Sequence, residues 1–548
     1  MALGGLGEIG MNAYLYGLGT NKSRQWLMVD LGLTFPGEGE PGVDVVLPDI
    51  SFIEAQKDRL LGIVLTHAHE DHFGAVIDLW PRLQAPIYAT PFTAGLLKAK
   101  LADFGGRLKL PIREIDLGTR FDVGPFDIEM IGMAHSIPEP NGLAIRSSQG
   151  LVLHTGDWKL DDRPVMGEPT EADKLKALGD EGVLAIICDS TNALRDGISP
   201  SESDIAEELS AIIKKAPQRV AVTTFASNAG RLKAVSLAAK AAGRKLVVCG
   251  RAMHRIIKVA IDTGYLDKSF KYLDQRDFSY LDRSEVVALC TGSQGESRAA
   301  MARVAAGDHP DISLARGDMV IFSSRTIPGN EKTVGRLQNL LIDMGCNVVT
   351  DGDALVHVTG HPRREELKQM YDWVRPKISV PMHGEARHLA GHARLARHCG
   401  VPEVRPIKNG QILRLSPGDA EIVDKVATGR IFRDGRLILG GDSDAVRERR
   451  KLAVVGVIFV ALALSRRGEI MSDAEVDLDG VPLQDADGRS MEDYVFDAVY
   501  GTLDSVPRGR RKDADKMEES IKKAVRSTVA HVWGKRPIVK VMITRVDA

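Results

Sequence analysis

The chain has 548 residues, of which 44% are hydrophobic and 27% are charged, and this balance excludes a disordered or fibrous protein. With 72 basic and 74 acidic residues the formal net charge is −2, so the chain as a whole does not attract nucleic acid, and any polyanion must be bound by local basic groups or metal ions. The length predicts about three or four domains.

The first histidine-rich motif follows a predicted strand. Residues 11–33 alternate short apolar runs with Gly and polar breaks, which predicts paired strands, and the apolar run at 60–65 predicts a further buried strand. Directly after it comes the pattern His67-x-His69-x-Asp71-His72. Imidazole and carboxylate groups concentrated at a strand end indicate a transition-metal site, for zinc or manganese. The alternative is a polar loop with coincidental histidines. It is improbable because the chain has only 14 histidines in 548 residues, and three of them fall within six positions here.

Two further candidate ligands follow later predicted strands. Helical spacing over 75–83 and 91–101, with a strand over 86–89, predicts alternating helices and strands. His135 ends the apolar stretch from Ile128, and Asp157 ends the run from Gly150. Each residue alone is typical of a turn or a cap. Together with the first motif they support a site for two metals, because a second metal needs more ligands than the first motif supplies.

The order of these motifs resembles the metallo-β-lactamase fold of dinuclear hydrolases, an αββα sandwich. The resemblance implies that one metal is held by His67, His69 and His135, and that the other is held by Asp71 and His72, with Asp157 bridging. A later histidine would complete the ligand set.

An inserted domain separates the first motifs from that histidine. Residues 196–350 show helical spacing over 202–215 and 230–242 and strands over 219–224 and 245–249, which predicts an α/β domain. Its loops Thr224–Arg231 and Thr291–Glu296 are rich in small hydroxyl, amide and Gly residues, and such loops can hold phosphate through backbone N–H groups. Ordinary capped turns are the open alternative, since no Walker-type lysine is present.

Three more histidines follow the insertion, each near the end of an apolar run. The pattern resembles the β-CASP branch of the fold, whose members cut nucleic acids, with Asp189, His361 and His383 at its acidic and two histidine positions. His383 would be the remaining metal ligand. The resemblance narrows to the bacterial ribonuclease J family over essentially the whole chain, through Gly4–Gly10, Asp44–Asp49, Thr224–Asn228, Gly292–Gly295 and His357–His361.

The resemblance to ribonuclease J implies a metal-dependent ribonuclease of RNA maturation and decay. It implies 5′-to-3′ exonuclease activity that prefers a 5′-monophosphate, together with endonuclease activity. Two divalent ions, zinc first with manganese or magnesium as alternatives, would provide the hydroxide that attacks the phosphodiester. We expect Asp71 to orient the water, His361 to act as general acid, His357 to bind the scissile phosphate and Asp189 to support a metal-bound histidine.

The substrate-binding residues expected are Phe225, Ser227, Asn228, Arg231, His357, Thr359, Gly360 and His361. Among them, Ser227, Asn228, Arg231 and the Gly360 backbone would form the pocket for the terminal phosphate.

The chain is therefore predicted to be an α/β protein with an interrupted catalytic domain. The metallo-β-lactamase domain covers 1–195 and 351–430 around the inserted β-CASP domain at 196–350, and a linker at 431–451 leads to a small C-terminal α/β domain at 452–548. The charged run Arg447–Lys451 is typical of a solvated linker, with an RNA contact as the alternative. Leu452–Leu464 is too short to span a bilayer and predicts a buried strand. We expect helices over 491–503 and up to Trp533, and a closing strand over 537–543.

The expected partners and location also follow from these features. The resemblance implies RNA as substrate, a homodimer or homotetramer formed through the C-terminal domain, and other RNA-decay proteins as further partners. Five scattered cysteines without a Cys-x-x-Cys pair, and a start without a basic region before an apolar stretch, predict a cytoplasmic protein that does not enter a membrane.

A structural calcium site of the kind that some relatives carry is a further expectation, at Gly42, Asp44 and Asp442. Acidic loop residues that cap turns are the alternative.

Two other functions stay open at this point. Small-molecule hydrolases such as lactonases and thioesterases use the same fold, but they would need neither the insertion nor the His357/His361 pair. A non-catalytic RNA-binding or scaffold subunit would be free to lose metal ligands, whereas all seven proposed ligands are present.

Overall fold

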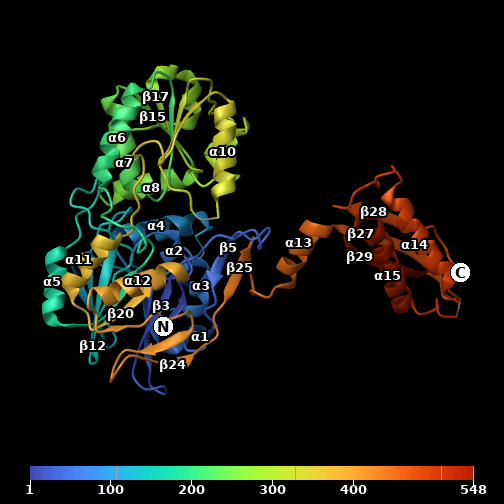
Figure 1. The fold of residues 1–548 in the computed structure, drawn as a ribbon, viewed down its shortest axis with the longest axis horizontal. Helices are drawn as coiled ribbons and strands as arrows, with labels where there is room; N and C mark the ends of the chain where they lie inside the picture. The colour runs from blue at the N-terminus through green and yellow to red at the C-terminus, as the bar shows by residue number, and fades with distance from the viewer. Residues whose placement is uncertain (107, 328, 508, 547–548) are drawn as a thin grey trace. The chain divides into compact units, whose positions relative to one another are not determined.

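The computed structural model describes residues 1–106, 108–327, 329–507 and 509–546 and divides the chain into two compact units (Figure 1). One unit contains Met1–Phe35 and Val46–Ile431, and the other contains Pro36–Val45 and Phe432–Ala548. Within the described residues, no helix has both the length and the apolar character needed to cross a membrane.

Two sheets pack face to face in the larger unit. The first has the order β1 (Ala2–Gly4), β3 (Ala13–Leu18), β4 (Gln25–Val29), β6 (Leu60–Val64), β7 (Ile87–Ala89), β8 (Ile112–Glu114). The second has the order β22 (Glu403–Val404), β20 (Ile378–Met382), β13 (Val183–Asp189), β12 (Gly150–His154), β11 (Asn141–Ser147), β10 (Phe126–Gly132), β9 (Arg120–Val123). Branched apolar side chains of the two inner faces, including Val29, Val64, Ile128 and Ile187, form one core.

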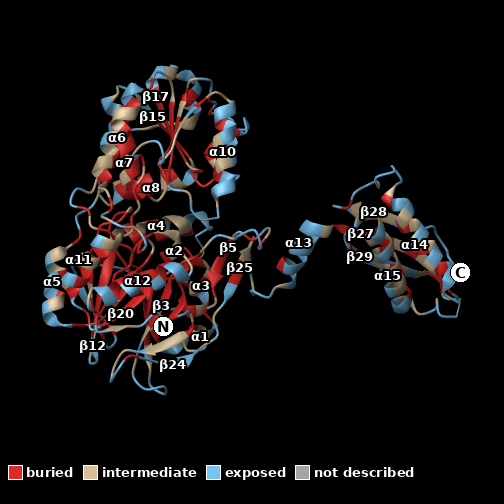
Figure 2. Ribbon diagram, in the orientation of Figure 1, coloured by how far each residue is buried: buried red, intermediate tan, exposed pale blue. Residues whose placement is uncertain are grey.

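Helices complete the sandwich that the sequence predicted. On the outer face of the second sheet, Ile186 packs with Leu178, Met370 and Leu395 from α5 (Ala172–Glu181), α11 (Arg364–Val374) and α12 (Ala386–His398). The predicted helices after β6 and β7 are confirmed as α3 (Val76–Leu83) and α4 (Pro91–Asp103). Figure 2 shows how strongly burial is concentrated in the strands. The shorter elements of this unit are α1 (Ser51–Glu54), a 3-10 turn at Lys57–Arg59, α2 (Glu70–Phe73), β2 (Leu6–Gly7), β5 (Val45–Pro48), β21 (Gly384–Glu385), β23 (Gln411–Arg414) and β24 (Glu421–Lys425).

The inserted domain is built on a six-stranded parallel sheet, which is larger than the two α/β units visible in the sequence. Its order is β16 (Leu273–Asp274), β15 (Lys245–Cys249), β17 (Val286–Cys290), β14 (Val220–Thr223), β18 (Met319–Phe322), β19 (Asn347–Val349). The helices are α6 (Glu202–Lys215), α7 (Ala229–Ala241), α8 (Arg251–Asp262), α9 (Ala300–Ala305) and α10 (Glu331–Asp343), with 3-10 turns at Gln275–Tyr280 and Arg283–Glu285. Figure 1 shows α6 and α7 on one side of this sheet and α10 on the other.

The register of this sheet brings the two candidate phosphate loops together. Thr223 of β14 pairs with Cys290 of β17, so the loops that begin at Thr224 and Thr291 leave the same sheet edge from neighbouring strands. The carboxyl ends of parallel strands are the usual place for ligand sites in open α/β sheets.

The smaller unit corrects two sequence predictions. The segment predicted as a linker contains β25 (Arg430–Asp434), β26 (Leu437–Leu439) and most of α13 (Asp444–Val455). Its charged run is an exposed helix because Arg, Glu, Lys and Leu are strong helix formers. The strand predicted from Leu452 begins instead at Val457, after Gly456 ends α13 with a positive φ of 61°.

The rest of this unit follows the expected C-terminal α/β pattern. A sheet of order β28 (Glu475–Asp479), β27 (Val457–Ser465), β29 (Ile538–Val546) packs through Ile458 and Val460 against α14 (Met491–Ser505) and α15 (Ala514–Trp533).

Candidate metal centre

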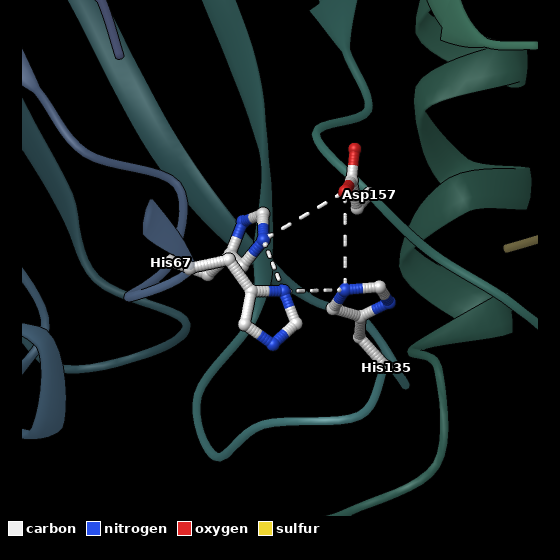
Figure 3. Close-up of side chains that lie close together, drawn as sticks. His67, His135 and Asp157 are labelled. Carbon is white, nitrogen blue, oxygen red and sulfur yellow. Dashed lines mark hydrogen bonds and ion pairs between the residues drawn. The ribbon is translucent and has the colours of Figure 1, made fainter. Parts of the chain in front are cut away.

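The first group of candidate ligands surrounds the loop that leaves β6. The Nδ1 atom of His69 lies 3.1 Å from Nε2 of His67 and 3.0 Å from Nε2 of His135. The Oδ2 atom of Asp157 lies 3.8 Å from both of those Nε2 atoms. Figure 3 shows His67, His135 and Asp157 pointing toward one another. All four ligand atoms lie within 4.8 Å of one another, which is compatible with a shared cation.

A second group lies beside the first and shares one residue with it. Asp71, His72, Asp157 and His383 also place their ligand atoms within 4.8 Å of one another. The Oδ2 atom of Asp157 is 3.1 Å from Nε2 of His72 and 3.5 Å from Nε2 of His383. The seven ligands predicted from the sequence therefore converge, with Asp157 common to both groups.

The donors of these groups fit a divalent cation. Asp157 Oδ1 and His383 Nε2 are buried and, among the described residues, have no hydrogen-bond partner. Three imidazoles also direct ring nitrogens toward one another at 3.0–3.1 Å in the first group. Buried polar atoms are rarely left unpaired, and nitrogen with carboxylate oxygen is a donor set that zinc prefers.

The electrostatics of the first group favour the metal-binding protonation states. Burial holds the pKa of His67 and of His135 well below the ordinary value and lowers the pKa of His69 to about 4, so these rings are neutral. Burial opposes ionisation of Asp157, but the charges of His383, His72 and His361 outweigh it and hold its pKa well below its usual range. Neutral imidazoles around an ionised carboxylate are the forms that bind metal.

Two residues that the sequence analysis missed orient the second group. Asp30, fully buried at the end of β4, accepts hydrogen bonds from the Thr66 backbone N–H at 2.8 Å and lies 2.7 Å from Nδ1 of His72. Asn12 contacts His72 and His383. The sequence contains a signal for Asp30, because this residue follows a predicted strand as the proposed ligands do. Asn12 had none.

A third group adjoins the metal ligands. His361 Nδ1 lies 2.7 Å from Oδ2 of Asp189 and 3.8 Å from Oδ2 of Asp157. Burial disfavours the charged ring of His361, but Asp189 and Asp157 outweigh it and raise its pKa to about 9. Asp189 was expected to support a metal-bound histidine, whereas its contact here is with His361, which is a candidate acid and not one of the seven proposed ligands.

Comparison with known proteins identifies the family. Residues 217–341 match the model of the ribonuclease J beta-CASP domain, and residues 444–546 match that of the ribonuclease J C-terminal domain. Residues 40–245 match a beta-lactamase superfamily domain, and residues 348–405 match a Zn-dependent metallo-hydrolase RNA specificity domain. Ribonuclease J of Sinorhizobium meliloti is 50% identical over 546 residues, which cover 100% of this chain and 97% of that protein. The chain belongs to the ribonuclease J family.

Other relatives agree with this assignment. Ribonuclease J of Mycolicibacterium smegmatis is 37% identical, with 98% of this chain and 95% of that protein covered. A crystal structure of a protein of unknown function from Enterococcus faecalis V583 covers 74% of this chain and 97% of its own, with a TM-score of 0.50 and 14% identity, and it supports the fold alone. Membership in the family makes this chain a metal-dependent ribonuclease.

The substrate residues expected from the family lie partly at one cavity. Phe225 lines a cavity of about 590 Å³ together with Thr291, Gly292 and Ser293 from the neighbouring loop. Ser227 is half-buried, and the Asn228 side chain accepts a hydrogen bond from the Arg231 backbone N–H at 2.8 Å. Asn228 therefore also caps α7, which was the open alternative for this loop.

Arg231 does not reach the cavity in this structure. Its guanidinium is fully buried, pairs with Glu202 at 2.9 Å, and donates to the Ser323 side chain and to the Val356 carbonyl at 2.9 Å. We therefore correct the expectation that Arg231 binds the terminal phosphate directly. Because it holds the backbone next to His357, it is a positioning residue.

The loop with His357 and His361 is held in place from several sides. Asn192 donates to Thr359 Oγ1 at 3.1 Å and to the His361 carbonyl at 3.2 Å. The Gly360 carbonyl lies 2.6 Å from His135 Nδ1, and a Cβ on Gly360 would overlap the same ring. Gly360 thereby fixes a proposed metal ligand as well as the loop.

The calcium candidates lie in the smaller unit. The Asp44 carboxylate accepts a hydrogen bond from the Gly435 backbone N–H at 2.7 Å, as a turn cap does. The ligand groups found among the described residues include neither Asp44 nor Asp442. Calcium binding by these residues and Gly42 stays a prediction.

Proposed function

We propose that this ribonuclease removes nucleotides from the 5′ end of RNA, prefers a 5′-monophosphate, and also cleaves internally, with two divalent metal ions per chain. Zinc is the favoured ion, with manganese or magnesium as alternatives. The observation that carries the two-ion proposal is the position of Asp157, whose Oδ2 atom belongs to both ligand groups. A pair of ions can stabilise both the attacking and the leaving oxygen of an in-line displacement at phosphorus.

The residues around the ions have separate roles in this proposal. His67, His69 and His135 would hold one ion, and Asp71, His72 and His383 would hold the other, with Asp157 available to both groups. Asp71 has 29% of its side chain exposed, so it is placed where it can orient an attacking water.

His361 is the proposed general acid. Its Nδ1 atom is bound to Asp189, which leaves Nε2 as the atom that can give a proton to the leaving ribose oxygen. With a pKa raised to about 9, the ring carries that proton at neutral pH. Its side chain is 18% exposed, so substrate can reach it.

His357 lies among positive charges that suit a phosphate. Burial, followed by the charges of Arg231, Arg325, Lys159 and Arg195, holds its pKa well below the ordinary value, and its Nδ1 atom has no hydrogen-bond partner within the described part of the chain. Burial and the charges of Arg325 and Arg363 also lower the pKa of Arg195. Arg231 and Lys159 are buried and paired with Glu202 and Asp161, so the charges that a phosphate can reach are those of the exposed Arg325 and the half-buried Arg195. These two residues support binding of a polyanion by a chain whose net charge is −2.

The terminal phosphate is proposed to bind at the loop with Ser227 and Asn228, near the Gly360 backbone, with Phe225 in contact with the first nucleotide. Two features support this assignment. Thr224–Arg231 leads into the amino end of α7, where backbone N–H groups favour anions, and Phe225 presents an aromatic ring to the adjacent cavity.

The direct test uses RNA labelled at either end and carrying a 5′-monophosphate or a 5′-hydroxyl. We expect mononucleotides from the 5′ end, faster on the monophosphate, and loss of that preference in Ser227→Ala. Ser236→Ala, half-buried on α7 and outside the lining of that cavity, is the matched control. Equal rates on both ends in the parent protein would refute the phosphate pocket, and internal fragments alone would reduce the proposal to an endonuclease.

The earlier alternatives are weaker on this structure. A non-catalytic subunit does not need seven convergent ligands, and a small-molecule hydrolase does not need the cationic residues near His357. Turnover of a lactone panel, without RNA cleavage, would favour the small-molecule hydrolase.

Self-association through the C-terminal domain, as a homodimer or homotetramer, belongs to the same proposal. Its support is the match of residues 444–546 to the family's C-terminal domain. Light scattering of the intact chain would measure the oligomer, and a monomer at micromolar concentration would refute it.

A further inference from the structure

The glycine-rich opening of the chain, Gly4–Gly10, is part of the motif set of the family but has no role in the chemistry proposed above. It lies directly against the last metal ligand. The His383 backbone N–H donates to the Gly5 carbonyl at 3.0 Å, and β2 pairs with β21, Leu6 opposite Gly384. The glycine-rich opening therefore fixes the backbone of His383, which lies near the other end of the larger unit's sequence.

The side chain of Asn12, just after this opening, joins both halves of the second ligand group. It is fully buried and its Nδ2 atom lies 3.1 Å from the Asp71 carbonyl and 3.0 Å from Nε2 of His72. Its Oδ1 atom accepts a hydrogen bond from the Tyr14 hydroxyl at 2.9 Å and lies 3.0 Å from Nδ1 of His383. One amide thus contacts three of the proposed ligands.

The orientation of this amide follows from its partners. A backbone carbonyl can only accept, so the atom facing Asp71 must be the NH₂ group of Asn12, and the atom facing His383 must be the oxygen. An amide oxygen also can only accept, so the proton of a neutral His383 must lie on Nδ1. The lone pair then lies on Nε2, the buried atom that has no partner among the described residues and that lies 3.5 Å from Asp157.

Gly5 leaves the space for this arrangement. It has a positive φ of 92°, and a Cβ there would lie 2.5 Å from Asn12 Oδ1 and 2.6 Å from the Tyr14 hydroxyl. Any side chain at this position would push the amide away from His383. The glycine-rich opening is thus explained by close approach to Asn12 and Tyr14.

We propose that Asn12 is a positioning residue of the metal centre, which sets the Nδ1–H tautomer of His383 and holds the Asp71 backbone carbonyl, and thereby determines affinity for the second ion. This inference rests on the two-ion centre proposed above. Partners that orient metal-binding histidines typically contribute 10–100-fold to metal affinity. The first ion should be unaffected, because Asn12 contacts none of its histidines: His67 Nδ1 contacts the Thr66 hydroxyl, and His135 Nδ1–H donates to the Gly360 carbonyl.

The test is zinc binding by the intact chain, measured by competition with a chromophoric chelator and by elemental analysis after dialysis. The parent should bind two zinc ions. Asn12→Ala should keep one and bind the other roughly 10–100-fold more weakly. Asn12→Asp keeps an acceptor for His383 Nδ1–H but places an oxygen opposite the Asp71 carbonyl, so it should recover only part of the affinity that Asn12→Ala loses. Tyr14→Phe removes the hydroxyl that donates to Oδ1 and keeps the Asn12 amide itself, so it is the matched control and should retain both ions.

The outcomes separate the two proposals. Two ions of parental affinity in Asn12→Ala would overturn the role of Asn12 alone, whereas one ion in the parent would overturn the two-ion centre. If Asn12→Ala does not fold, the tautomer is read in the metal-free parent from long-range ¹H–¹⁵N spectra of histidine, with the His383 signals assigned by their absence in His383→Gln. A proton on Nε2 of His383 would overturn the inference.

Discussion

Arg231 provides a sharp test, because the structure gives it a role different from the one expected from the sequence. Its guanidinium is 0% exposed and pairs with the Glu202 carboxylate, itself 6% exposed, at 2.9 Å. Glu202 Oε1 has no hydrogen-bond partner within the described residues, so the hydrogen bond from Arg231 to Oε2 is the main contact that offsets burial of this carboxylate. Arg231→Met fills a similar volume but leaves the buried Glu202 carboxylate without its charged partner.

The expected cost of Arg231→Met is about 3–5 kcal/mol, the typical penalty for removing one partner of a buried ion pair. For a domain of this size, about 2–4 °C is lost per kcal/mol, so the melting temperature should fall by roughly 6–20 °C. Differential scanning calorimetry measures the shift. The double variant with Glu202→Gln should recover part of it, because no unpaired charge stays buried.

A direct phosphate ligand would behave differently. In that case Arg231→Met would abolish the preference for a 5′-monophosphate over a 5′-hydroxyl with little effect on melting. We expect instead that the cleavage rates on both ends fall together, because the Val356 carbonyl loses a donor and the His357 loop shifts. Parental stability combined with a lost end preference would refute the positioning role.

Three other predictions concern the centre and its surroundings. Asp30→Asn should move the His72 proton from Nδ1 to Nε2, because the acceptor for Nδ1–H is lost. Zinc affinity, measured by chelator competition, should then fall roughly 10–100-fold. Asp318 is a buried carboxylate of the inserted domain, and the control Asp318→Asn should leave zinc affinity unchanged. Burial raises the pKa of Glu139, so the folded chain binds its proton more tightly than the unfolded chain, and this stabilising contribution is lost as pH rises above about 4.5 through the folded pKa. Glu139→Gln should therefore gain stability relative to the parent as pH rises through that window, measured by urea unfolding; a pH-independent difference would contradict it. Removing zinc with a chelator should lower the unfolding free energy by about 2.7 kcal/mol per site relative to zinc at 100 times its Kd, and an unchanged melting temperature would show that no ion binds.

The metal ligands were accessible to sequence reasoning because of where they lie. His67–His72, His135, Asp157 and His383 each follow an apolar run, and such runs become strands whose ends place side chains at one edge. The pattern needs no knowledge of long-range contacts. Asp30 follows the same rule and could have been found, but a single aspartate after a strand resembles an ordinary cap.

Other roles depended on contacts that the sequence does not display. Arg231 follows a capping Asn in the first turn of α7, and the local sequence does not determine whether its side chain turns to solvent or to the core. Its burial depends on Glu202 and Ser323, on different elements. The helix at 444–455 was not predicted, because a run of charged residues is compatible with both a linker and an exposed helix.

The contact between Asn12 and His383 has a consequence for synthesis of the protein. The two residues are 371 positions apart, and the segment between them includes the entire inserted domain. Chains emerge from the ribosome amino end first, and domains begin to fold as they emerge. The last proposed ligand is therefore missing until translation has passed residue 383, so the second ligand group cannot form on the nascent chain before the whole inserted domain has been made.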